Sequence, residues 1–157
     1  MRNRLFFTST SLMVAVLAFT VVAWAADSNV GTWKLNLDKS KYKTGTPPKE
    51  QTLTIAESGS DLDVTINGTA ADGSAIASHY TVPAQGGEGK IIQSPYEAVS
   101  GKRMGPNERE VRYSKGGKVV LTTHSKISAD GKTLTVNVKG TDMQDKPVNA
   151  AVVYDKQ

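Results

Sequence analysis

The sequence predicts an all-β domain: a single antiparallel up-and-down meander closed into a barrel of about 8–10 strands. Three observations favour this fold class. From residue 30 onward, apolar and polar residues alternate with a period of two, as in half-buried strands. Clusters of Gly, Asp, Asn or Pro interrupt the alternation about every 8–12 residues. From the same point on, the sequence lacks the apolar stripe of an amphipathic helix.

About ten strands are expected, most of them separated by a tight turn. The turns include Asp72-Gly73, Gly116-Gly117 and Asp130-Gly131, where glycine supplies the positive φ that hairpins need. Short turns make neighbours in sequence antiparallel partners. The glycine-rich segment 85–89 opens no helix and is expected to be a mobile loop. The expected strands are, in order, 30–37, 51–57, 61–67, 74–82, 89–94, 96–103, 108–115, 118–127, 132–139 and 147–155.

The alternation gives each strand one apolar face. Because no helix is available to cover these faces, the sheet must curl into a barrel or stack as a sandwich. A meander with short turns favours the barrel, and a sandwich or half-open roll is the alternative. The expected inward sets are Trp33, Leu35 and Leu37; Leu53 and Ile55; Leu62, Val64 and Ile66; Ile76, Tyr80 and Val82; Val111 and Tyr113; Val119, Leu121 and Ile127; Leu134, Val136 and Val138; and Val148, Ala150, Val152 and Tyr154.

Composition excludes several classes of function. The chain of 157 residues has no cysteine, which rules out disulfides, thiolate metal ligands and thiol nucleophiles. It has 2 histidines and a net charge of +4, so neither a His-rich metal site nor a concentrated basic face for nucleic acid is expected. We expect no cofactor and no metal site.

The first 25 residues have the pattern of a cleavable signal peptide. Arg2 and Arg4 precede an apolar stretch, which ends in the small-residue site Ala23-Trp24-Ala25. We therefore expect a signal peptide at 1–25, a barrel domain at 26–157, and a periplasmic or secreted bacterial protein with no stable membrane insertion. An uncleaved membrane anchor is the alternative.

A faint internal repeat is present. Residues 62–69, Leu-Asp-Val-Thr-Ile-Asn-Gly-Thr, are echoed by residues 134–141, Leu-Thr-Val-Asn-Val-Lys-Gly-Thr. The strands that follow the two copies end in Tyr80 and Tyr154. Duplication of a four-strand unit and convergent hairpin chemistry both explain the pattern, and either one indicates that the two halves form the same kind of sheet.

The motif Gly31-Thr32-Trp33-Lys34-Leu35, with the terminal strand Val152–Lys156, resembles the calycin superfamily of lipocalins and fatty-acid-binding proteins. The stretches 31–43, 129–140 and 148–157 resemble a family of small exported bacterial lipocalin-like proteins. The resemblance implies a lipocalin-like barrel with the Trp33 indole at one end.

Two departures from the fatty-acid-binding pattern leave the ligand open. Those proteins place an arginine two residues before a tyrosine on the last strand, whereas this chain has Val152 before Tyr154. They also insert a two-helix lid after the first strand, and residues 38–50 are too few for one and contain Pro47-Pro48.

The expected interior offers a candidate site for a small hydrophobic ligand. Serines, threonines and tyrosines among aliphatic residues are the usual make-up of a small-molecule pocket, although the same residues would also suit a filled core. Arg103 and Arg112 are possible anchors for an anionic head group if they turn inward. The candidate lining residues are Trp33, Leu53, Tyr80, Tyr113, Leu121 and Tyr154.

The sequence lacks a catalytic constellation, so we expect a non-catalytic protein. The leading hypothesis is an exported binding protein for an apolar or lipid-like molecule. The alternative is a solid barrel that acts as an inhibitor or an envelope-associated structural protein. It would bind a protein partner through the loops 38–50, 83–90 and 141–147.

Overall fold

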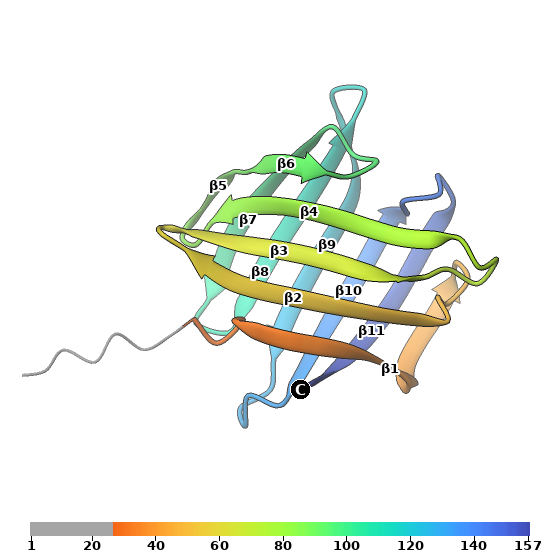
Figure 1. Cartoon of the computed structure of the whole chain (residues 1–157), viewed down its shortest axis with the longest axis horizontal. Coiled ribbons are helices and arrows are strands. Elements are labelled where there is room, and N and C mark those ends of the chain that lie inside the picture. Colours follow the sequence, from red (N-terminus) through yellow and green to blue (C-terminus); the bar gives the residue numbers. More distant parts are fainter. Residues whose placement is uncertain (1–26) are drawn as a thin grey trace, which may run out of the picture.

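The computed structural model describes residues 27–157, so the expected signal peptide lies outside the described residues. The described chain is all-β and forms eleven antiparallel strands in a nearly closed up-and-down barrel (Figure 1). Within it, no helix has the length and apolar character needed to cross a membrane. The strands are β1 (Gly31–Thr44), β2 (Glu50–Ser58), β3 (Asp61–Thr69), β4 (Ala75–Pro83), β5 (Gly86–Glu88), β6 (Lys90–Gln93), β7 (Ala98–Gly105), β8 (Glu108–Lys115), β9 (Lys118–Ile127), β10 (Thr133–Thr141) and β11 (Pro147–Lys156).

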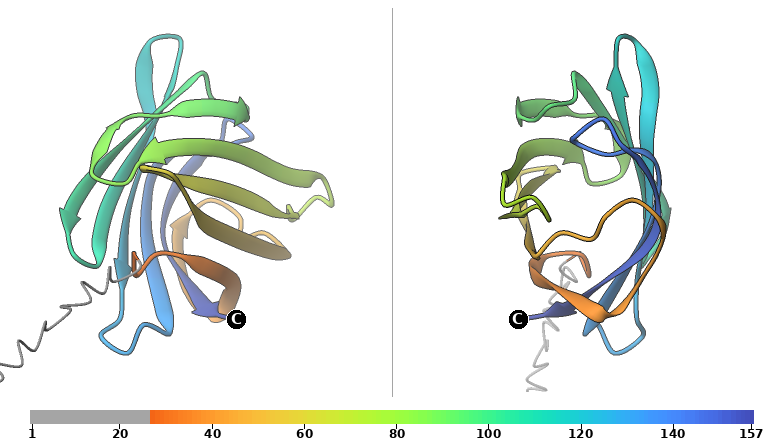
Figure 2. Two further views of the ribbon diagram at one scale, coloured as in Figure 1. Left: turned by 60° about the vertical axis from the view of Figure 1, so that its left-hand side comes forward. Right: turned by 90° about the vertical axis from the view of Figure 1, so that its right-hand side faces the viewer.

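The barrel closes through one short segment of chain. The sheet runs in the order β5-β7-β8-β9-β10-β11-β1-β2-β3-β4-β6, and Figure 2 shows how it curls round on itself. β5 pairs with β7 while β6 pairs with β4, so Gly89, between β5 and β6, lies at the seam. A Cβ at Gly89 would lie 2.7 Å from Cγ1 of Val82 and 2.9 Å from Cγ1 of Val99, so only glycine fits.

The strand count and one loop differ from the expectation. The segment 85–89 is not a free loop, because Gly86 and Gly87 adopt positive φ and pair with Lys102 and Gly101 of β7. The expected recognition loop 83–90 therefore contains β5, and the barrel has eleven strands rather than about ten. The glycines that suggested mobility instead allow a tight approach to the neighbouring strand.

The first strand is longer than expected and contains a bulge. β1 continues to Thr44, so about half of the expected loop 38–50 belongs to the strand. The pairing of β1 with β11 shifts register between Asn36 and Lys41. At the bulge the hydroxyl of Ser40 donates to the Asn36 carbonyl (2.7 Å) and accepts from the Val153 amide (2.9 Å). The extra residues reverse the inward parity. Leu37, expected inside, lies in the unpaired segment of the bulge and is 42% exposed.

A second irregularity corrects the expected face of β9. Its pairing with β8 shifts register between Tyr113 and Ser114, opposite Leu121 and Val119. Val119 therefore faces solvent and is 55% exposed, while Leu121 is buried. A single-residue shift in a strand turns the side chains before it to the other face.

The core lies inside the barrel, and its most fully buried large apolar side chains gather at one end. Trp33, Leu62, Ile127 and Leu134 are almost completely buried there. Burying a large aliphatic side chain contributes roughly 1.5–3 kcal/mol, so this group fixes how the strands meet at that end. We call it the closed end. The opposite end, where the loops 45–49, 70–74 and 142–146 lie, is called the mouth.

Candidate ligand cavity

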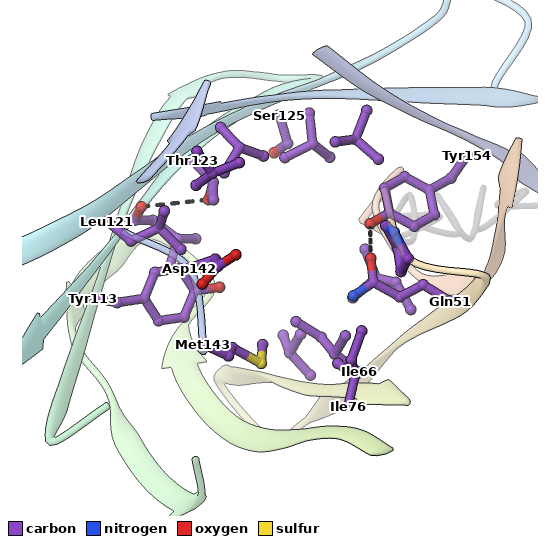
Figure 3. A pocket seen from close by; sticks show the side chains of 18 of the residues that line it. Gln51, Ile66, Ile76, Tyr113, Leu121, Thr123, Ser125, Asp142, Met143 and Tyr154 are labelled. Atoms are coloured by element: carbon purple, nitrogen blue, oxygen red, sulfur yellow. Dashed lines mark hydrogen bonds between the residues drawn. The ribbon is translucent and has the colours of Figure 1, made fainter. Parts of the chain in front are cut away.

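The barrel encloses a cavity of about 530 Å³ (Figure 3). This volume falls within the range of roughly 300–1,000 Å³ found for small-molecule sites. The cavity extends from Asn29 and Arg109 at the closed end to Thr46, Asp72 and Lys146 at the mouth, where its lining residues are exposed. Aliphatic side chains make up much of its wall: Leu53, Ile55, Leu62, Val64, Ile66, Ile76, Val82, Val111, Leu121, Leu134, Val136, Val138, Val148 and Val152.

The structure brings together most of the lining residues expected from sequence. Leu53, Tyr80, Tyr113, Leu121 and Tyr154 all line the cavity. Trp33 does not: its indole is fully buried below the cavity floor, and Nε1 donates to the Asn29 carbonyl at 2.9 Å. Where the strands are regular, the alternation identifies inward residues, but it does not tell which inward residues border the cavity.

Three tyrosines form a cluster on one wall. The hydroxyls of Tyr80 and Tyr113 are 2.7 Å apart and hydrogen-bonded, and their rings meet edge to face with centroids 5.6 Å apart. Tyr96 packs on Tyr113 at 5.0 Å, and its hydroxyl donates to the Thr141 carbonyl. Burial raises the pKa of Tyr113 to about 12 and raises the pKa values of Tyr80 and Tyr96 above the usual range. The phenols are therefore neutral hydrogen-bonding groups at physiological pH.

A second polar group lies on the wall formed by β2 and β11. The Tyr154 hydroxyl donates to Oε1 of Gln51 at 2.5 Å, as Figure 3 shows across the cavity from Tyr113. Burial raises the pKa of Tyr154, so this phenol is neutral too. Gln51 was not among the expected lining residues. Its parity with Leu53 and Ile55 on the same strand was the signal for it.

The closed end is sealed by a charged network. Nη2 of Arg109 donates to Oδ2 of Asp27, and Nη1 donates to the Ala84 carbonyl at 2.6 Å. Both side chains of this ion pair are only 8% exposed. Burial alone would raise the pKa of Asp27, but hydrogen bonds from Asn29 and the charge of Arg109 outweigh it and hold the pKa below its usual value.

The arginine that reaches the cavity is not one of the two expected. Arg112 faces outward, is 52% exposed and pairs with Glu110 at 2.7 Å. Arg103 lies at the closed end, outside the cavity lining, with Nη1 3.9 Å from Asp27. Arg109 lines the cavity instead. Its parity matches the inward residues Val111 and Tyr113, so the alternation contained the signal.

Two further aromatic residues of the lining were missed. Tyr42 lines the cavity because it follows the bulge of β1, which reverses the parity set by Trp33. Tyr96 precedes β7 in an irregular segment, where no alternation applies, and it is nonetheless only 3% exposed. Neither position could be assigned from a period of two.

Residues of the loops 45–49, 70–74 and 142–146 line the mouth, and the last two loops are linked. Gln144 donates from Nε2 to the Ser74 hydroxyl at 3.0 Å, which links the β10–β11 loop to the β3–β4 loop. Met143 packs against the core from the same loop and lines the cavity. The charged lining residues here are Asp72, Asp142 and Lys146.

The chemistry that this arrangement supports is apolar burial with a few neutral hydrogen bonds. Across residues 27–157, no group of three or more His, Asp or Glu side chains is placed to hold a metal ion. His79 has Nε2 3.0 Å from both carboxylate oxygens of Asp63, and the two side chains are about one-third exposed, away from the cavity lining.

Comparisons with known proteins identify no family. No family model matches the sequence, and no curated protein matches it. Solved structures that resemble the chain are β-barrels. One is the zebrafish ileal bile acid-binding protein complexed with cholic acid, at 14% identity over 83% of this chain and 99% of that one, with a TM-score of 0.48.

Two designed proteins give similar values. The redesigned β-barrel mFAP1 bound to DFHBI matches at 13% identity over 82% of this chain and 95% of that one, with a TM-score of 0.45. A de novo designed fluorescence-activating barrel matches at 15% identity over 85% and 100%, with a TM-score of 0.41. With TM-scores below 0.5, these likenesses carry no conclusion about family or ligand.

Proposed function

We propose that this chain is an exported, non-catalytic, lipocalin-like protein that binds a small, largely apolar molecule inside its barrel. The observation that carries the proposal is the cavity of about 530 Å³ with a mostly aliphatic wall. Burial in such a site contributes roughly 25 cal/mol per Å² of apolar surface, before the cost of immobilising the ligand. Leu53, Tyr80, Tyr113, Leu121 and Tyr154 are the proposed contacts.

The alternative of a solid barrel that acts only through its rim loops loses its basis, because the interior holds a cavity. Two of the three loops proposed for recognition are also reduced by strand pairing in β1 and β5. The carrier proposal is therefore the one that we put to the test.

Pyrene tests the cavity directly, because it is apolar, fluorescent and without hydrogen-bonding groups. We expect saturable binding of one pyrene per chain. Ile66→Trp, which places a large side chain into the cavity from its wall, should abolish pyrene binding. Val119→Trp, on the exposed outer face, should leave pyrene binding unchanged. Equal binding by both variants would place pyrene outside the barrel and would overturn the proposal.

Export rests on residues 1–25, whose pattern is that of a signal peptide. Expression of the full chain in a Gram-negative host, followed by fractionation and N-terminal sequencing, tests it. We expect a periplasmic or secreted product that begins at Ala26. A full-length product retained in the cytoplasm or the membrane would contradict this part of the proposal.

A further inference from the structure

We infer that the cavity selects neutral ligands with a terminal hydroxyl or carbonyl group over anionic amphiphiles of the same length, such as fatty acids. The inference rests on the proposed binding function and specifies its ligand class. It follows from where the charges of the cavity lie and from which polar groups have unused hydrogen-bonding capacity.

The buried cation that lines the cavity, Arg109, already has a buried counter-ion in Asp27, and the second cation near Asp27, Arg103, lies outside the cavity lining with its Nη1 3.9 Å from the carboxylate. Arg109 donates to Asp27 and to the Ala84 carbonyl, and both members of the ion pair are 8% exposed. Its Nε is buried and has no hydrogen-bond partner in residues 27–157. This Nε–H can donate to a neutral ligand oxygen as well as to a carboxylate. A carboxylate there would also approach the Asp27 charge, and it would lose its water without gaining a free counter-ion.

The mouth also disfavours an anion. Asp72 and Asp142 line it, against one lysine, Lys146. Oδ1 of Asp142 accepts hydrogen bonds from the backbone amides of Gln144 and Lys146, both at 2.9 Å. The Asp142 carboxylate is labelled among the cavity-lining side chains in Figure 3. A carboxylate ligand would therefore meet two carboxylates and one ammonium group on entry, which is a net charge of its own sign.

The available polar groups suit neutral oxygen atoms. Oε1 of Gln51 is occupied by the Tyr154 hydroxyl, so its amide nitrogen is left to donate. On the opposite wall the Tyr80 and Tyr113 hydroxyls bond to each other, which uses one of their two protons, and the Thr123 hydroxyl, which also lines the cavity, is a further hydrogen-bonding group beside Tyr113. Figure 3 shows Gln51 and Tyr113 on opposite sides of the cavity.

Competition between matched ligands tests the inference. Bound pyrene is displaced with hexadecanol or with palmitate, which share a chain length and differ in head group, at pH 8, below their critical aggregation concentrations. We expect hexadecanol to compete about tenfold more tightly, since a buried carboxylate without a free cation is strongly penalised. Palmitate competing as well as hexadecanol, or better, would overturn the inference. Failure of pyrene itself to bind would instead remove the proposed function.

Variants of Gln51 identify the group responsible. Gln51→Leu combined with Tyr154→Phe should weaken hexadecanol several-fold more than it weakens pyrene, because the double change removes both polar groups of that wall and leaves no hydroxyl free to replace the lost donor. Gln51→Lys should reverse the selectivity toward palmitate by supplying the missing cation. If palmitate binds the natural protein tightly and Arg109→Met abolishes that binding while pyrene still binds, then Arg109 is the anion anchor and the inference is wrong.

Discussion

The hairpins β3–β4 and β10–β11 are built on the same frame, 72 residues apart. Thr69 pairs with Ala75 and Leu62 with Val82 in the first, and the residues at the same offset, Thr141 with Pro147 and Leu134 with Tyr154, pair in the second. The loops match as well: the amide of residue 70 donates to the carbonyl of residue 74, and that of 142 to that of 146. Gly73 and Asp145 both adopt positive φ.

The two hairpins differ in what they present to the cavity. The tyrosines that end the two copies are not equivalent, because at the common offset Tyr80 corresponds to Val152 and Tyr154 corresponds to Val82. Tyr154 therefore lies one inward position nearer to the closed end than Tyr80 does. The hydroxyl of Tyr80 bonds to Tyr113, and that of Tyr154 bonds to Gln51. The comparison indicates that backbone register is repeated while the polar groups of the cavity are placed separately in each half.

The largest expected effect on stability comes from truncating the two buried leucines of the shared frame to alanine. Leu62 and Leu134 are each 1% exposed and occupy equivalent positions at the closed end. Leu62→Ala and Leu134→Ala should each lower the free energy of unfolding by about 3 kcal/mol through lost burial and the cavity left behind. Urea denaturation measures both. Values that differ by more than about 2 kcal/mol would show that the two halves pack differently.

The equivalent glycines give a somewhat smaller effect. A Cβ at Gly68 would lie 2.9 Å from the Gln51 Cα, and a Cβ at Gly140 would lie 2.8 Å from the Leu121 Cα, while each would also collide with a carbonyl oxygen. Gly68→Ala and Gly140→Ala should each cost about 2 kcal/mol, because backbone must move apart. Gly105→Ala is the control, since its Cβ would meet only Glu108 Cβ at 3.9 Å, and it should change stability by less than about 0.5 kcal/mol.

Sequence predicted the frame of these hairpins better than the site. Alternation and turn residues are local signals, so β3, β4, β10 and β11 and the inward positions of Tyr80 and Tyr154 could be read from them. The bulge that brings Tyr42 inward depends on pairing between β1 and β11, and the Asp27–Arg109 pair joins residues 82 positions apart. Both are consequences of closure, which no local window contains.

Alkaline titration tests the burial of Tyr113, the partner of Tyr80 in the cavity wall. Burial raises the pKa of Tyr113 from 10.0 to about 12 in the folded protein. A raised folded pKa contributes stability that is complete below pH 10 and is lost as the pH rises from 10 to 12. Near pH 11.5, Tyr113→Phe should recover about 1–2 kcal/mol of the alkaline loss relative to the natural protein. Chemical denaturation as a function of pH measures it, and an unchanged alkaline slope would contradict the assignment.

The smallest effect on stability is expected where the two loops touch. Gln144 occupies the position equivalent to Asp72, but it reaches across the mouth to Ser74 instead of capping its own loop. Because Gln144 is exposed, Gln144→Ala should change the free energy of unfolding by less than about 0.5 kcal/mol. The same change removes the link across the mouth, so pyrene should dissociate several-fold faster in stopped-flow measurements. An unchanged dissociation rate would mean that the ligand leaves elsewhere, and the seam at Gly89 would be the next place to look.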